Sequence, residues 1–158
     1  MTAGENDSPG VVARPPLIFL AALAAGLVLE VAWPSPALPV PGAVRYPVAA
    51  LLVIAGFAVA ATALRWFRHA GTHADPRKSA TALVTDGLFR HTRNPMYLAL
   101  ISVYLGLAIA FGSLWVAGLL IPTLVVLRIG VIAREERYLE AKFGGAYRNY
   151  KASVRRWL

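Results

Sequence analysis

The sequence predicts an all-α fold, a polytopic membrane bundle of four transmembrane helices with a cytoplasmic loop and a C-terminal amphipathic helix. Three observations predict it. Of the 158 residues, 58% are hydrophobic and only 15% are charged. The hydrophobic residues form long runs, and the basic residues behind the net charge of +8 stand at the ends of these runs. A soluble domain of this size usually carries more charge, so we expect one membrane domain.

Residues 1–16 are polar and are predicted to form a disordered cytoplasmic tail, ahead of a single domain over residues 17–158. The first predicted helix, residues 17–33, is apolar except for Glu30. The tail before it has one basic and two acidic residues, which is a poor signal-peptide start, so this helix is interpreted as a transmembrane span. After a proline-rich connection, an uncharged run predicts the second helix at about residues 47–67.

The third and fourth helices are predicted from one long run. Pro95 to Leu127 contains 33 residues with no charged side chain. As one helix it would extend roughly 50 Å, well beyond a hydrocarbon core of about 30 Å. Basic residues stand at both ends, so the run is expected to cross the membrane twice. Gly112 can leave helical geometry, which predicts helices at residues 95–111 and 114–133.

The distribution of basic residues predicts the orientation. The loop at residues 65–94 carries six Lys or Arg residues, and the tail at residues 134–158 carries seven. The connection between the first two helices carries only Arg45. The positive-inside rule therefore places both termini and both basic segments in the cytoplasm, and we expect a bacterial inner-membrane protein. Anionic lipid is the expected partner of this charge, and nucleic acid is not. The oligomeric state stays open.

Two short patterns have structural explanations. Asn94 is a good helix N-cap, and Pro95 suits the first helical position. Ser102, Gly106 and Ala110 recur every four residues and predict a stripe that lets another helix approach closely.

The C-terminal tail carries an unusual pair of carboxylates. Ile132, Glu136 and Leu139 fall on one helical face, and Glu135 flanks this face where the chain leaves the membrane. A carboxylate in this position is costly without a cationic partner. The partner is either an arginine, namely Arg93, Arg128 or Arg134, or a cationic ligand. The residues alone do not decide between them.

Other kinds of site are less supported. There is no cysteine, which excludes disulfides and thiolate metal ligands. His69 and His73 have a metal-ligand spacing, but Gly71 weakens the helix between them and only Asp75 is near, so no metal is expected. Arg128 either reaches the lipid headgroups or points into a cavity to hold an anion.

Two segments together resemble the isoprenylcysteine carboxyl methyltransferase family of integral-membrane enzymes, which is related to phospholipid N-methyltransferases. They are "ALVTDGLFRHTRNPMY" at residues 82–97 and "REERYLEAKFGGAYRNY" at residues 134–150, separated by the predicted helical hairpin. The resemblance covers over half of the chain.

The resemblance implies S-adenosylmethionine as the methyl donor, bound at the cytoplasmic end of the bundle. It implies a cofactor site made of Thr81, Ala82, Leu83, Val84, Phe89, Asn94, Pro95, Met96, Tyr97 and Glu135. Arg93 and Glu136 are expected to support this site. Asn94 stands where eukaryotic members have histidine, and Val131 stands where the family has a substrate arginine. Arg128 or Arg134 is therefore the expected replacement for substrate binding.

The expected function is methyl transfer from S-adenosylmethionine to a lipophilic acceptor, favouring a carboxylate such as that of an isoprenylcysteine. An ionised carboxylate needs no general base, so no catalytic residue is assigned. Acceptor thiols and phospholipids are alternatives. Two further hypotheses are a membrane lipid reductase that uses NADPH, and a scaffold without chemistry.

Overall fold

The computed structural model describes residues 8–157, and residues 1–7 of the predicted tail lie outside this range. The described chain is helical. Its elements in order are α1 (Pro15–Ala32), α2 (Gly42–His69), the 3₁₀ helix η1 (Gly87–Arg90), α3 (Pro95–Phe111), α4 (Leu114–Leu127), the π-helix η2 (Arg128–Ile132), α5 (Ala133–Phe143) and α6 (Gly145–Ser153).

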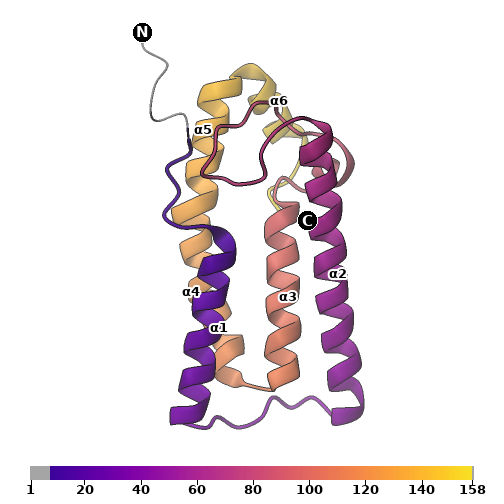
Figure 1. Cartoon of the computed structure of the whole chain (residues 1–158), viewed down its shortest axis with the longest axis vertical. Coiled ribbons are helices and arrows are strands. Elements are labelled where there is room, and N and C mark those ends of the chain that lie inside the picture. The colour runs from indigo at the N-terminus through magenta and orange to yellow at the C-terminus, as the bar shows by residue number, and fades with distance from the viewer. Residues whose placement is uncertain (1–7, 158) are drawn as a thin grey trace.

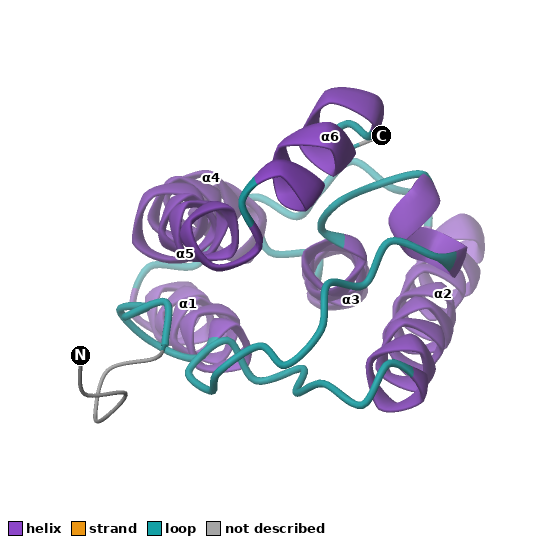
Figure 2. Cartoon of the chain, turned by 90° about the horizontal axis from the view of Figure 1, so that it is seen from above, coloured by secondary structure: helices purple, strands orange, loops and turns teal. Residues whose placement is uncertain are grey.

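The long helices stand side by side (Figure 1). α1 packs mainly on α4, and α2 packs mainly on α3. Seen from above, α5 continues over α4, and α6 lies at the same end of the bundle (Figure 2). We call this end, which also holds the segment between α2 and α3, the upper end of the bundle.

Three helical stretches are long and apolar enough to cross a membrane. They are Pro15–Ala32, Gly42–His69 and the continuous run Leu114–Phe143 that joins α4, η2 and α5. α3 is apolar but shorter, with 17 residues. The two helices of the predicted hairpin, α3 and α4, are present. Because α3 is shorter than the other three stretches, the predicted count of four spans depends on whether α3 crosses the membrane.

The boundaries of α3 agree with the prediction at both ends. Pro95 is its first residue. Gly112 ends the helix in the left-handed region, with φ of 65°, and Ser113 then caps α4 by accepting from the Val116 N–H at 3.2 Å. The first two helices begin earlier than predicted. Pro47 lies inside α2, whose Arg45 donates to the Ile109 and Ala110 carbonyls at the end of α3.

The small-residue stripe of α3 faces α2, as its packing interpretation requires. Ser102 Oγ donates to the Leu52 carbonyl at 2.7 Å. A Cβ atom added at Gly106 would lie 2.8 Å from the Ala49 carbonyl oxygen, which is closer than such atoms can approach. The two backbones are therefore in direct contact at this glycine.

Gly106→Ala is expected to destabilise the protein by about 1–3 kcal/mol, because the added methyl group forces α2 and α3 apart. Thermal unfolding in detergent measures the effect. Gly118→Ala is the matched control, since a Cβ atom at Gly118 of α4 meets nothing within 4 Å. An equal melting temperature for the two variants would contradict close packing at Gly106.

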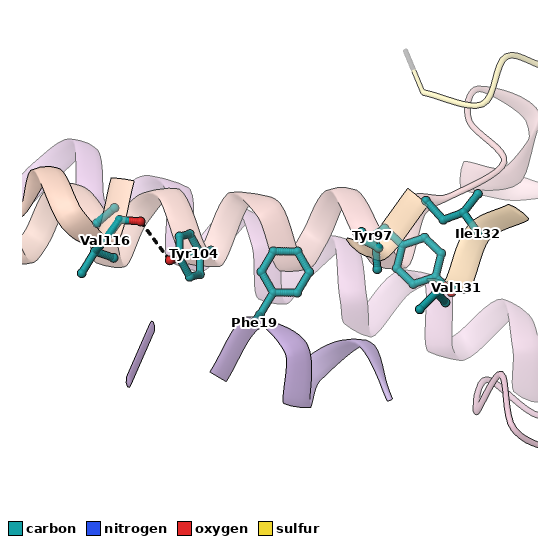
Figure 3. Close-up of a cluster of buried hydrophobic side chains, with 8 residues drawn as sticks. Phe19, Tyr97, Tyr104, Val116, Val131 and Ile132 are labelled. Atoms are coloured by element: carbon teal, nitrogen blue, oxygen red, sulfur yellow. Dashed lines mark hydrogen bonds between the residues drawn. The ribbon is translucent and has the colours of Figure 1, made fainter. Parts of the chain in front are cut away.

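A buried cluster joins α1, α3, α4 and η2 (Figure 3). The ring of Phe19 contacts the ring of Tyr104 edge-on, with centroids 5.7 Å apart. Tyr104 Oη donates to the Val116 carbonyl at 2.9 Å, so the buried hydroxyl is satisfied. Val131 and Ile132 of the π-helix complete the cluster and are fully buried.

The C-terminal region differs from the predicted fourth helix and single amphipathic helix. The helix does not end near residue 133 but continues through η2 into α5. Gly144, with φ of 53°, then separates α5 from α6. Buried Tyr147 and Tyr150 of α6 pack with Leu139 and with Phe89 of η1. The C-terminal region therefore folds back onto the segment that precedes α3.

Glu30, the one charged residue of α1, lies at the opposite, lower end. Its carboxylate accepts from the backbone N–H and the hydroxyl of Ser35 at 2.9 and 2.7 Å, and from Ser113 Oγ. It therefore ties α1 to the turn between α3 and α4.

Candidate functional site

A cavity of about 720 Å³ extends from the upper end of the bundle down between the helices. Its lower wall is apolar. That wall comes from Phe19, Leu20 and Leu23 of α1, Phe57, Ala60 and Leu64 of α2, and Leu100, Val103 and Leu107 of α3. Because α1 packs on α4 and α2 packs on α3, the space between α1 and α2 is left to the cavity.

The upper part of the cavity contains its charged side chains and most of the predicted cofactor residues. Those that line it are Ala82, Leu83, Val84, Phe89, Asn94, Pro95, Met96, Tyr97 and Glu135, together with the supporting residues Arg93 and Glu136. Thr81 is not among the lining residues. Its hydroxyl donates to the Gly71 carbonyl and its N–H to Thr72 Oγ1, so it shapes the loop behind the wall.

Glu135 is the acid that faces this cavity without an arginine. Tyr97 Oη donates to its carboxylate at 2.5 Å. Within residues 8–157 no ion pair involves Glu135. Tyr97 is buried in the cluster below, as Figure 3 shows, so its hydroxyl fixes the carboxylate from α3. The Glu135 carboxylate therefore accepts a hydrogen bond from Tyr97, but no cationic side chain among the described residues pairs with it.

Glu136 has the opposite environment. It is buried, with 8% of its surface exposed. Arg156 donates to both of its carboxylate oxygens, from Nε at 2.9 Å and from Nη2 at 2.8 Å. Arg93 Nη1 lies 3.2 Å from Oε1. Arg93, one of the arginines considered as partners for the two acids, therefore pairs with Glu136 and not with Glu135.

Asn94 occupies the N-cap position of α3, but it does not cap the helix as predicted. Its side-chain amide donates to the Arg156 carbonyl at 2.9 Å, because the C-terminal segment lies within reach. The N–H groups of Tyr97 and Leu98 donate to the Asn94 carbonyl. The Met96 N–H has no partner among the residues that the structure describes. The positive end of α3 is therefore uncapped where it borders the cavity.

The loop between α2 and η1 covers the cavity from above. It runs toward α1 and returns (Figure 2), and Arg14 at the start of α1 pairs with Asp75 of the loop at 3.2 Å. The Ala80 N–H donates to Tyr138 Oη of α5 at 3.1 Å. Residues from three parts of the chain thus close the upper side.

The tyrosines of α6 behind the site stay protonated near neutral pH. Burial raises the pKa of the Tyr147 phenol to about 12, and it holds the pKa of Tyr150 further above the usual range. Tyr150 Oη donates to the Phe89 carbonyl at 2.7 Å. Tyr150 therefore acts as a hydrogen-bond donor, and both rings act as packing groups.

Arg128 and Arg134, the arginines expected to bind substrate, do not line the cavity. Arg128 is exposed at the start of η2. Arg134 is also exposed, and its Nη1 donates to the Gly10 carbonyl at 2.6 Å. The π-helix widens one turn between Arg128 and Glu135, so seven residues no longer bring them to the same side. The arginines that line the cavity are Arg93 and Arg14, and Arg14 pairs with Asp75 of the loop.

Sequence reasoning missed Arg156 and Asp75. Arg156 lies in a basic tail beside Arg155, and nothing in its local pattern distinguishes the two. The polar residues between Gly71 and Ser79 mark a loop, but they do not reveal its ion pair with Arg14.

Over most of its length the chain is similar to a known protein family. A family model described as "Phospholipid methyltransferase" matches residues 44–146, which is 103 of the 158 residues. An uncharacterized protein of Haemophilus influenzae is 50% identical over 64 residues, which cover 40% of this chain and 100% of that protein. No solved structure matches the chain. The family match includes Asn94, Tyr97 and Glu135, and it ends before Arg156.

Proposed function

Because the chain belongs to the phospholipid methyltransferase family of membrane proteins, we propose that it transfers a methyl group from S-adenosylmethionine to a lipophilic acceptor. The observation that carries this proposal is the Glu135 carboxylate, which faces the cavity with a tyrosine partner and no cation. A half-buried carboxylate without a cationic partner favours a cationic ligand. The donor carries an ammonium group and a sulfonium cation.

The residues at the upper end fit such a donor. Glu135 accepts from its ammonium or ribose hydroxyl groups. The rings of Phe89 and Tyr97 offer π faces to a cation. The uncapped N-terminus of α3, with the free N–H of Met96, suits its carboxylate. Leu83 and Val84 provide apolar wall for the adenosine.

The apolar lower part of the cavity suits the tail of the acceptor. Residues of α1, α2 and α3 line it, and Tyr97 and Leu100 line the same cavity. A tail placed there lies among apolar side chains, while its reactive group lies at the level of Arg93 and Pro95. We assign a carboxylate as the acceptor, with an isoprenylcysteine-type carboxyl group as the example, and Arg93 as the group that orients it.

Positioning supplies the rate in this proposal. Bound S-adenosylmethionine supplies an activated methyl carbon, and the acceptor oxygen forms its bond to that carbon as the carbon–sulfur bond breaks and its electron pair stays on sulfur. A carboxylate enters already ionised, so no residue has to remove a proton. The chain's own part is to hold the two reactants in line and to exclude water.

The proposed placement in the membrane has four crossings. α3 is 17 residues long, about 25 Å at 1.5 Å per residue, and it runs beside α2 in the bundle (Figure 1). The upper end carries the two basic segments and is proposed to be cytoplasmic. The cofactor site then lies on the cytoplasmic side of a bacterial inner membrane.

A phospholipid amine is the second acceptor class, and the family description favours it. An amine must lose a proton before it attacks, and the phenols of Tyr147 and Tyr150 are not bases near neutral pH. A carboxylate acceptor needs no such proton transfer, and for this reason it stays the first choice. Membership of a methyltransferase family weighs against both the NADPH-dependent reductase and the scaffold.

Isothermal titration calorimetry of the purified protein tests the proposal. In separate titrations we expect S-adenosylmethionine and its demethylated product each to bind with one molecule per chain. We expect no binding of NADPH. Radiolabelled methyl transfer to a panel of lipophilic acids, thiols and phospholipid amines then identifies the acceptor. Binding of NADPH without binding of the methyl donor would replace this proposal with the reductase. Binding of neither would leave the scaffold.

A further inference from the structure

The C-terminal segment after α6 lies directly against the residues that begin α3. The Arg93 N–H donates to the Arg155 carbonyl at 3.0 Å. Thr92 Oγ1 and the Asn94 amide both donate to the Arg156 carbonyl, at 3.1 and 2.9 Å. Residues more than 60 positions apart in the chain are thus joined by three hydrogen bonds next to the cavity.

The side chain of Arg156 makes the second connection of this segment, to α5. Its two hydrogen bonds occupy both oxygens of Glu136 in a fork geometry, which is the strongest arrangement for an arginine and a carboxylate. Arg93 is a weaker partner. Its Nε and Nη1 atoms are buried without a hydrogen-bond partner in the part of the chain that the structure describes. Arg156 therefore contributes the hydrogen bonds that fix Glu136.

Glu135 and Glu136 are neighbours on α5, and each is held by a different partner. Both residues lie in the first turn of α5, just after the π-helix, so fixing one side chain limits the rotation of that turn. With Glu136 directed to Arg156, Glu135 is directed to Tyr97 and the cavity. Without Arg156, a buried carboxylate would lose its main partner beside Glu135, and the turn would rearrange to satisfy it.

We propose that Arg156 is a positioning residue of the methyl-donor site, which it orders through Glu136 and Glu135. This inference rests on the proposed function. It assigns a role to a residue that lies outside the matched range of the family model.

Binding of S-adenosylmethionine to four variants tests the inference by a double-mutant cycle. Arg156→Gln is expected to weaken binding by roughly 10- to 100-fold, the effect of losing hydrogen bonds to a charged group. In the Glu135→Gln background the same substitution is expected to change binding by less than about threefold, because coupled residues are not additive. Arg156→Lys keeps the positive charge but cannot make both hydrogen bonds to Glu136. Its affinity for S-adenosylmethionine is expected to lie between that of the wild type and that of Arg156→Gln. Arg148→Gln is the matched control, since Arg148 is exposed on α6 and does not line the cavity.

The outcomes separate the possible explanations. A role in folding alone would give the same loss in both backgrounds, and this result would overturn the inference. Wild-type affinity in Arg156→Gln, or an equal loss in Arg148→Gln, would also overturn it. If Arg156→Gln does not fold, the cycle is measured with Arg156→Lys and the same criteria apply. Failure of the wild-type protein to bind the donor would instead refute the proposed function.

Discussion

Glu135→Gln is expected to weaken S-adenosylmethionine binding by about 10- to 100-fold, because hydrogen bonds to charged groups contribute roughly 1.5–3 kcal/mol. Glutamine keeps the size of the side chain and can still accept from Tyr97 Oη. It removes the negative charge that faces the cavity. The measurement is calorimetric titration of the detergent-purified variant, and methyl transfer should fall with donor affinity.

Glu140→Gln provides the control for this substitution. Glu140 is on the same helix, and its substitution removes the same charge. Its carboxylate pairs with Lys151 Nζ at a distance of 3.2 Å, and it does not line the cavity. Its donor affinity should equal that of the wild type. If Glu135→Gln also binds the donor as tightly as the wild type does, the open carboxylate is not the donor site.

The second large effect is expected at the acceptor. Ala60 of α2 lines the apolar part of the cavity, and Ala60→Phe would fill the space between α1 and α2. If the acceptor tail loses its contacts over two or three methylene groups, it loses about 0.8 kcal/mol of binding free energy for each group. Together these losses lower kcat/KM by roughly 15- to 60-fold. Donor binding should not change, because Ala60 lies below the polar part of the cavity. Initial rates with acceptors of increasing chain length measure the effect.

Ala58→Phe is the matched control for the groove. Ala58 is two residues away on the same helix, but it is exposed on the outside of the bundle and does not line the cavity. It should retain the wild-type preference for chain length. Equal rates for Ala58→Phe and Ala60→Phe with a long-chain acceptor would show that the tail does not lie between α1 and α2.

The sequence predicted the hairpin of α3 and α4 well, because local chemistry sets its ends. Proline favours the first position of a helix, and glycine can adopt the left-handed conformation that ends one. Both residues stand at the observed ends of α3. The starts of α1 and α2 were less accurate. Apolar residues continue beyond each helix, and proline inside the first turns of α2 does not prevent its formation.

Nine of the ten predicted cofactor residues line the cavity, because they are contributed by two segments that the resemblance identified. The family motifs did not predict that Arg128 and Arg134 lie outside the cavity. Arg128 and Glu135 would share a face on a regular helix, and the π-helix between them removes that alignment. A single widened turn has no signal in hydrophobic periodicity, so the sequence could not place Arg128 outside the cavity.

The sequence by itself determined a helical membrane protein with a polar site at its basic end. These properties follow from hydrophobicity, charge and helix-end preferences, each of which acts over a few neighbouring residues. Only the tertiary structure decided which of two adjacent glutamates is free. That choice depends on Arg156, which lies 20 residues beyond Glu136 and reaches it because α6 turns the chain back. Charges pair by distance in space, so the partition between Glu135 and Glu136 could not be derived from their order in the chain.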